Sequence, residues 1–109
     1  MHAARKYDTA FNALGDPTRR EIFERLSAGP LSVVHIAEGL PVSRPAVSQH
    51  LKVLCSAKLV KMEKRGTRSM YELDKEGIKA MRDYLDRFWD EALANFKALA
   101  EQTARQNKK

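Results

Sequence analysis

Apolar residues recur at helical spacing in two short segments between Leu31 and Leu54. The segments are Val33, Ile36, Ala37 and Leu40, which Ser32 can cap, and Val47, Leu51 and Leu54, which Ser43 can cap. The residues from Gly39 to Val42 interrupt the periodicity, and Pro45 fits a first helical turn, where no intrahelical bond is lost. The pattern predicts two short helices joined by a tight turn.

The second predicted helix carries polar residues on the faces that its apolar stripe leaves free. The outward residues are Arg44, Ala46, Ser48, Gln49, His50 and Lys52. In a helix-turn-helix, the N-terminal half of the second helix enters the DNA major groove, where Arg pairs with guanine and Gln with adenine. Two packed helices with a polar outer face also occur in any all-α domain, so a plain helical scaffold stays an alternative at this point.

The residues from Val60 to Leu73 are typical of two short strands around a turn at Arg65-Gly66-Thr67. Glycine supplies the backbone freedom that a tight hairpin needs. Four basic residues are predicted to crowd its tip, namely Lys61, Lys64, Arg65 and Arg68. A basic hairpin can lie along phosphates or enter a minor groove. A helix-turn-helix followed by a basic wing is a winged helix, which favours DNA binding.

Two further helices are predicted before this segment. Tyr7, Phe11 and Leu14 form an apolar stripe in a first helix that ends near Gly15. Asp16 is a good cap for a second helix, which turns Ile22, Phe23 and Leu26 toward the core and pairs Glu21 with Arg25.

A long helix is predicted to end the chain, with Asp74 as its cap. Apolar residues recur in steps of three and four over about six turns, at Ile78, Met81, Leu85, Phe88, Ala92, Phe96 and Leu99, with Trp89 and Leu93 beside them. Gly77 weakens the start of this helix. The polar tail from Gln102 is predicted to fray.

The apolar band of this last helix is too wide for one small domain to bury. We therefore predict a two-fold dimer interface formed by Tyr7, Phe11, Leu85, Phe88, Trp89, Ala92 and Phe96. One alternative is that the helix folds back on its own core. Another is a pocket for an apolar effector, although the sequence offers no polar constellation to support one, and no effector is assigned.

The motifs together resemble the ArsR/SmtB-type bacterial transcriptional repressors. The matching segments are FNALGDPTRREIFERL (Phe11 to Leu26), VSRPAVSQHLKVL (Val42 to Leu54), the A-x-L-V step (Ala57 to Val60) and KRGTRSMYEL (Lys64 to Leu73). The resemblance extends from about Tyr7 into the last helix. It implies a homodimeric winged helix in which the helix at Ser43–Ala57 reads the operator and the terminal helices build the dimer.

Positive charge is concentrated in the proposed DNA-binding half. The chain of 109 residues carries a formal net charge of +6, and residues 1–73 hold 12 Lys and Arg against 7 Asp and Glu. Such an excess indicates a polyanionic partner, either nucleic acid or an anionic membrane surface. No apolar run approaches ~18 residues, and MHAARKYDTA lacks the apolar region of a signal peptide. We therefore expect no membrane association.

Cysteine usage favours a reducing compartment. Cys55 is the only cysteine, so it cannot form an intrachain disulfide. A cytoplasmic protein is expected. Cys55 is interpreted as a small packing residue, with a redox switch as the less favoured alternative.

The resemblance also raises the question of metal sensing. The family's third-helix motif carries cysteines in an L-C-x-C-D context, whereas this chain has Leu31-Ser32-Val33-Val34-His35, without a thiol. The family's other site uses Asp and His on the last helix, which here contains no His; the histidines are His2, His35 and His50. We predict a member that lacks these metal sites and needs no cofactor.

Catalysis is not expected. The chain has no nucleophile with a nearby base and no glycine-rich phosphate cradle. Asp83, Asp86, Asp90 and Glu91 share their helix with Arg82 and Arg87 and are interpreted as a solvated, ion-paired face.

The sequence thus predicts one domain over residues 1–109, mainly α with a small β-hairpin, in a winged helix-turn-helix fold with helices at both termini forming a dimer interface. The predicted function is regulation of transcription by DNA binding, and the resemblance implies a homodimeric repressor that binds double-stranded operator DNA. The alternative is a winged helix used as a protein-interaction module.

Overall fold

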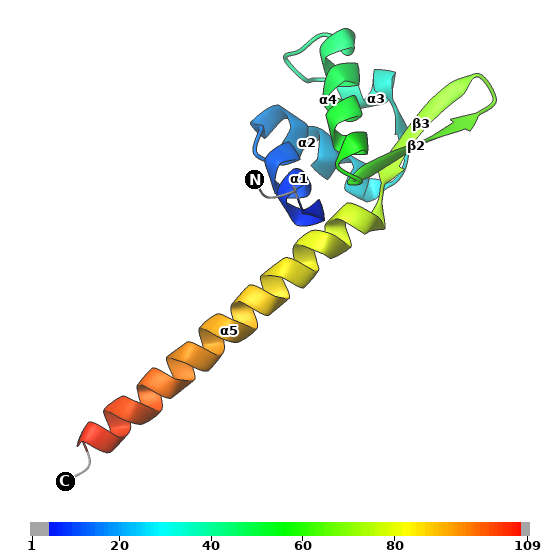
Figure 1. Cartoon of the computed structure of the whole chain (residues 1–109). Helices are drawn as coiled ribbons and strands as arrows, with labels where there is room; N and C mark the ends of the chain where they lie inside the picture. Colours follow the sequence, from blue (N-terminus) through cyan, green and yellow to red (C-terminus); the bar gives the residue numbers. More distant parts are fainter. Residues whose placement is uncertain (1–4, 108–109) are drawn as a thin grey trace.

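The computed structural model describes residues 5–107, and its elements form a head (residues 6–73) and one long projecting helix (Figure 1). In chain order they are α1 (Lys6–Ala13), α2 (Pro17–Arg25), the 3₁₀ turn η1 (Leu26–Ala28), β1 (Leu31–Ser32), α3 (Val33–Ala37), α4 (Arg44–Ser56), β2 (Val60–Arg65), β3 (Arg68–Leu73) and α5 (Lys75–Asn107). The pair α3 and α4 forms the predicted helix-turn-helix, and β2 and β3 form the wing (residues 60–73).

Two of the three predicted caps in the head are confirmed. The Asp16 carboxylate accepts a hydrogen bond from the backbone N–H of Arg19 at 3.0 Å, and the Ser43 hydroxyl accepts one from Ala46 N–H at 3.3 Å. Ser32 holds the N-cap position of α3 as predicted, but its side chain makes no capping bond to the helix backbone. Ser32 is also part of β1, and its Oγ lies 2.9 Å from His35 Nδ1.

The first helix of the helix-turn-helix is shorter than its apolar spacing indicates. α3 ends at Ala37, so Leu40, predicted as part of the same stripe, lies beyond the helix. Leu40 nevertheless reaches the core from the connecting turn. Burial of this side chain does not require helical backbone, which is why spacing alone placed it in the helix.

The wing is the predicted hairpin, with one strand added. Arg65 pairs with Arg68 across a two-residue turn, and Gly66 has a positive φ of 65° there, which glycine adopts without strain. The sheet is antiparallel in the order β1-β3-β2, and Leu31 of β1 lies opposite Tyr71 of β3. The sequence did not predict β1, since a two-residue strand exists only through this distant pairing.

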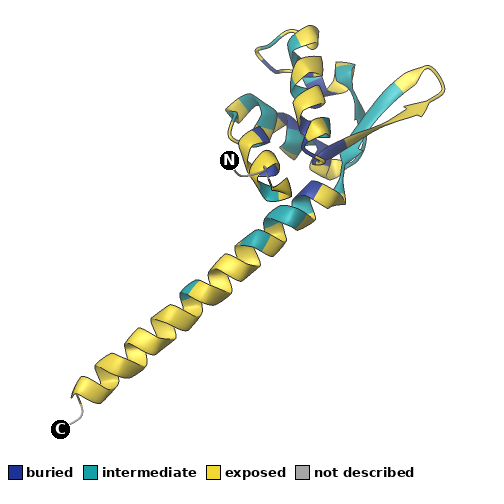
Figure 2. Ribbon diagram, viewed as in Figure 1, coloured by how far each residue is buried: buried dark blue, intermediate teal, exposed yellow. Residues whose placement is uncertain are grey.

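The core lies where the helices of the head meet the base of the wing (Figure 2). The apolar stripe predicted for α4 is confirmed, because its three members are fully buried. The largest fully buried side chains are Ile22, Leu26, Ile36, Val47, Leu51, Leu54, Leu59 and Val60. At roughly 1.5–3 kcal/mol for each fully buried aliphatic side chain, these residues hold α4 in a fixed orientation on the head.

The long helix α5 leaves the head instead of folding back over it. It has 33 residues, which corresponds to about 50 Å. The radius of gyration is 19.9 Å, whereas a compact chain of this size has roughly 13 Å. The alternative in which this helix folds back on its own core is therefore wrong.

The end of α5 also differs from the expectation. The tail from Gln102 was predicted to fray, but in the structure the helix continues through it to Asn107. Gln, Ala and Arg in this tail are good helix formers, and no Gly or Pro interrupts them. The last two residues of the predicted tail, Lys108 and Lys109, lie outside the described residues.

Candidate nucleic-acid interface

The exposed face of α4 consists of the positions that its buried stripe leaves free. Arg44, Ser48, Gln49 and Lys52 are exposed, while Ala46 is half-buried. These residues occupy the first turns of the helix, close to the Ser43 cap that sets where the helix begins. The face therefore has the donors and acceptors for base-edge contacts, held on a helix that the core keeps rigid.

His50 lies at the edge of this face. It is half-buried. At the start of α2, the pKa of Asp16 is lowered mainly by the hydrogen bond that its carboxylate accepts from Arg19 N–H, and least by the electrostatic influence of His50. Contact of His50 with DNA stays a prediction.

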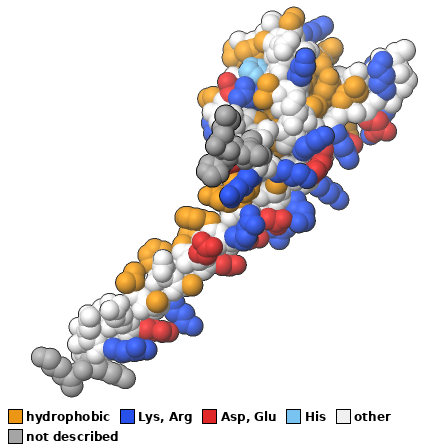
Figure 3. All heavy atoms as spheres, viewed as in Figure 1, with side chains coloured by type: hydrophobic (Ala, Val, Ile, Leu, Met, Phe, Trp, Pro, Cys, Tyr) orange, Lys and Arg blue, Asp and Glu red, His pale blue; other side chains and the backbone are white. Residues whose placement is uncertain are grey.

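The wing carries acidic as well as basic side chains (Figure 3). Lys64, Arg65 and Arg68 are exposed around the tip, but Arg65 Nη2 lies 3.5 Å from Glu63 Oε2. Lys61 was predicted at the tip and is not there. It lies at the base of the wing, opposite Glu72 on β3, at 3.8 Å between Nζ and Oε1. The basic character of the wing therefore concentrates at its tip.

A groove runs between α4 and the base of the wing. Its volume is ≈ 540 Å³, and it is lined by Ser48, Lys52, Cys55, Lys58, Val60, Lys61, Met62, Tyr71 and Asp74. Lys58 was not among the sequence candidates, because it follows the helix and carries no periodic signal. Its charge adds to the lysines on either side of the groove.

Cys55 lies half-buried in this groove. Burial raises the pKa of its thiol, and the nearby Asp74 carboxylate raises it further, whereas Lys58 lowers it. Because the thiolate is the reactive form, a raised pKa makes Cys55 less reactive. This environment favours the packing role.

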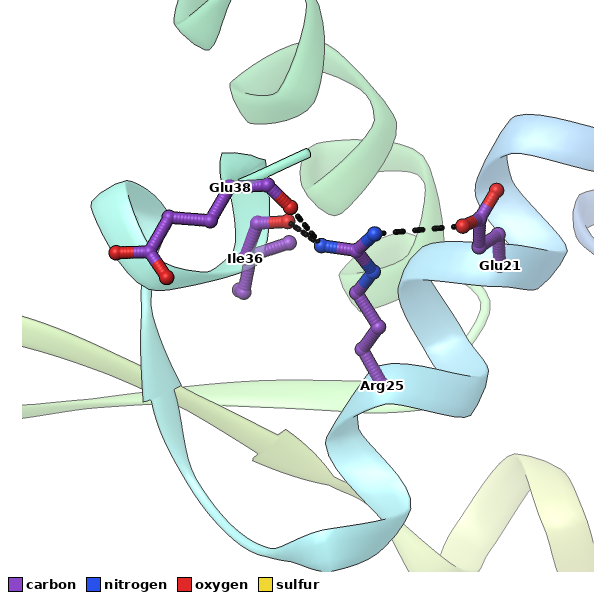
Figure 4. Close-up of polar contacts among 4 residues, drawn as sticks. All are labelled: Glu21, Arg25, Ile36 and Glu38. Carbon is purple, nitrogen blue, oxygen red and sulfur yellow. Dashed lines mark hydrogen bonds and ion pairs between the residues drawn. The ribbon is translucent and has the colours of Figure 1, made fainter. Parts of the chain in front are cut away.

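Arg25 fixes the turn between the two helices of the helix-turn-helix (Figure 4). Its Nη1 donates to the carbonyl of Ile36 at 2.9 Å and also to the carbonyl of Glu38, while Nη2 lies 3.4 Å from Glu21. The predicted Glu21–Arg25 pair is therefore confirmed. The carbonyl contacts were not predicted; they satisfy backbone oxygens that the end of α3 leaves without helical partners. Arg25 thereby ties α2 to the segment that leads into α4.

Aromatic side chains join α1 to the start of α5. Tyr7 stacks on Tyr84 with ring centroids 4.4 Å apart, and Phe11 meets Tyr84 edge-on at 5.7 Å. Tyr84 also stacks on Phe88 at 6.4 Å. Part of the predicted interface set thus packs within the chain, around Tyr84, which that set did not include.

Beyond this contact, the apolar residues of α5 are left uncovered in the chain. We call them the α5 apolar face: Leu85, Phe88, Trp89, Leu93, Phe96 and Leu99, each 48–64% exposed. Ala92, predicted in the same interface, is half-buried. Figure 3 shows such hydrophobic side chains following one edge of the long helix. Contiguous apolar surface of this kind marks an interaction site.

The described residues 5–107 contain no cluster of three or more His, Cys, Asp or Glu side chains placed to hold a metal ion. His35 is exposed, His50 lies on α4, and His2 is outside the described range. Within the same range, no helix combines the length and the apolarity needed to span a bilayer.

Comparison with known proteins gives consistent matches. The family model described as a helix-turn-helix domain matches residues 14–63. The HTH-type transcriptional regulator Rv2034 of Mycobacterium tuberculosis is 54% identical, with 93% of this chain and 94% of that protein covered. The arsenical resistance operon repressor of Staphylococcus xylosus is 34% identical, with 75% of this chain and 79% of that protein covered.

A solved structure is similar as well. It is the homodimeric winged helix-turn-helix DNA-binding domain of Mb0332 from Mycobacterium bovis, a possible ArsR-family transcriptional regulator. Its TM-score is 0.61 at 26% identity, with 83% of each chain covered.

Proposed function

Because the chain belongs to the ArsR/SmtB family of helix-turn-helix transcriptional regulators, we propose that it acts as a homodimeric repressor that reads an inverted-repeat operator. Membership makes it a DNA-binding regulator of transcription and not an enzyme. The observation that supports operator reading is the exposed polar face of α4, which is held on a rigid core beside a basic hairpin tip. Repression is supported by the relative that is named as an operon repressor.

In the proposed complex, α4 lies in the major groove and the wing contacts the flanking backbone or minor groove. Arg44 and Gln49 are the base-reading residues, since Arg suits guanine and Gln suits adenine. Ala46, Ser48, His50 and Lys52 complete the α4 surface. Lys64, Arg65 and Arg68 bind phosphates from the wing, where their charge contributes regardless of sequence.

The dimer is proposed to form through the α5 apolar face, together with Tyr7 and Phe11 on α1. A two-fold axis through these helices would place two α4 helices about 34–36 Å apart, one turn of DNA. Each subunit would then read half of an inverted repeat. The Mycobacterium bovis relative, whose winged helix-turn-helix domain is homodimeric, supports a homodimer.

A mobility-shift assay on the DNA upstream of the protein's own gene tests the proposal. We expect a complex that random DNA competes poorly and that raised salt dissociates. Equal competition by random and upstream DNA would overturn operator reading and favour the protein-interaction module.

The wing should contribute charge and not sequence reading. Replacing Arg65 or Arg68 by alanine is expected to weaken binding to operator and random DNA alike, and to reduce the salt slope by about one ion each. Binding constants measured across a salt series check this. Arg105→Ala, an exposed charge removed near the far end of α5, is the matched control and should leave the slope unchanged. An unaltered slope in both wing variants would exclude the wing from the interface.

Zinc should not act as the inducing signal. At micromolar excess, zinc is expected neither to bind stoichiometrically nor to release DNA, because the third-helix segment has no thiol and α5 has no His. Calorimetry and the mobility-shift assay measure the two effects. Tight binding at one ion per subunit, lost in His35→Ala, would contradict the prediction.

A further inference from the structure

The end of α4 and the start of α5 are joined backbone to backbone. We call this contact the α4–α5 joint; it comprises Ala57–Leu59 and Asp74–Gly77. Asp74 N–H donates to the carbonyl of Leu59 at 2.9 Å, and Gly77 N–H donates to the carbonyl of Lys58 at 2.7 Å. The two elements are separated in sequence by the whole wing, yet the first turn of one rests on the last turn of the other.

The α4 side of the joint is a fixed helix ending. Lys58 adopts a left-handed conformation with φ of 60°, which is uncommon for a residue with a side chain. Lys58 N–H donates to Cys55 O and Leu59 N–H to Leu54 O, both at 3.1 Å, which together form a Schellman motif. The carbonyls of Ala57 and Lys58 are thereby held in place against α5.

The α5 side of the joint has no spare room. Gly77 is buried, and a Cβ atom there would lie 2.6 Å from the carbonyl oxygens of both Ala57 and Lys58. These are backbone atoms, so no side-chain rotation relieves the clash. Only the absence of a side chain allows the two helices to approach this closely.

Contacts with α1 also hold the first turns of α5 in place. Lys6 Nζ lies 2.6 Å from Glu76 Oε1, and Tyr7 stacks on Tyr84 two turns further along. The start of α5 is therefore fixed between α1 and the end of α4. The angle between α4 and α5 is set by this packing.

We infer that Gly77 is a positioning residue that sets the half-site spacing read by the dimer, through the close approach of its backbone to Ala57 and Lys58. The inference rests on the proposed function. If α5 pairs about a two-fold axis, the joint fixes where each α4 lies relative to that axis. One base pair is about 3.4 Å along DNA, so moving each head by about 1.7 Å changes the matched spacing by one base pair.

An alanine at position 77 must open the joint. The contacts at 2.6 Å have to lengthen to the 3.4 Å of an ordinary van der Waals contact. The heads then tilt relative to α5 while the α4 face and the α5 apolar face stay intact. The affinity for one half-site and the dimerisation should therefore stay unchanged. Only the distance between the two α4 helices of the dimer should change.

The test compares operators that differ in half-site spacing. An operator is first selected from random duplexes with the wild-type protein, and variants are made with one or two base pairs added to or removed from its centre, together with a single half-site. Wild type should prefer one spacing. Gly77→Ala should lose about tenfold in affinity at that spacing, with a shifted or flattened preference, while half-site affinity and the dimer dissociation constant stay unchanged.

Gly15→Ala is the matched control. It makes the same chemical change at the corner between α1 and α2, where the nearest contact for a new Cβ is 3.2 Å to Asn12 O. The control should keep the wild-type spacing profile. A purely structural role for Gly77 would instead lower binding to all duplexes by the same factor.

A wild-type spacing profile in Gly77→Ala would overturn the inference. If that variant does not fold, Asp74→Pro decides, because proline lacks the N–H that Asp74 donates to the carbonyl of Leu59 and so weakens the same joint. Its profile should broaden, and an unchanged profile would overturn the inference. A wild-type protein that binds no inverted repeat would overturn the proposed function itself, a result distinct from either of these.

Discussion

Replacing Phe88 and Trp89 together by alanine should convert the protein to a monomer and abolish operator binding, although α4 is untouched. The two side chains are 53% and 57% exposed in the single chain. Shortening them should therefore change the free energy of unfolding of the head very little. In a two-fold interface each change occurs twice, and buried aromatic anchors cost about 2 kcal/mol or more apiece. We expect the dimer dissociation constant to rise by at least about a thousandfold.

Sedimentation velocity and a mobility-shift assay measure the two parts of this prediction. Arg87→Ala with Asp90→Ala is the matched control: two alanines on the same helix, at exposed positions that helical spacing places opposite the apolar face, with no net change in charge. The control should remain a dimer and bind operator normally. A folded, monomeric variant that still binds operator tightly would refute the role of α5.

Replacing Arg44 or Gln49 by alanine should cost about 1–3 kcal/mol of operator binding, because each is proposed to hold one base edge. The loss corresponds to roughly 5- to 150-fold in affinity. Binding to random DNA should change much less, since it depends on phosphate contacts.

Parallel titrations with operator and random duplexes distinguish base reading from charge. Arg105→Ala and Gln102→Ala remove the same side chains from the exposed end of α5 and serve as controls. Equal losses on operator and random DNA would make Arg44 and Gln49 phosphate-binding residues.

Features encoded within a few neighbouring residues could be predicted from the sequence. The caps at Asp16 and Ser43, the hairpin turn at Gly66 and the buried stripe of α4 each depend on residues at most about two turns apart. Helical spacing also assigned the outward face of α4, because a buried stripe fixes what lies opposite it. The predicted site residues on that face are therefore local inferences.

Features that depend on distant partners could not be predicted. Ser32 is a good cap by type, but pairing with Met70 recruits it into a strand. Arg25 has an obvious partner in Glu21, whereas its bonds to the carbonyls of Ile36 and Glu38 appear only after α2 and α3 have packed. The groove beside the wing likewise forms only when the end of α4 and β3 meet.

Gly77 shows the limit most clearly. Within its own helix, glycine is unfavourable, and the sequence therefore indicated only a weak start to α5. Glycine is required at this position because of the carbonyls of Ala57 and Lys58, which precede the wing in the sequence. Helix propensity shows that glycine is unfavourable here, but it does not show the distant contact that requires glycine.

The exposure of α5 links its folding to protein concentration. Isolated helices in water are marginal, and packing normally supplies most of their stability. Past Tyr84 this helix has little packing within its own chain. Its distal turns therefore gain stabilising packing only when two chains associate. By mass action, dilution should favour the monomer, in which the distal turns of α5 are unfolded. Operator DNA that binds the dimer should favour the folded form of these turns. Helix formation, assembly and DNA occupancy would respond together to a single variable, the number of chains in the cell.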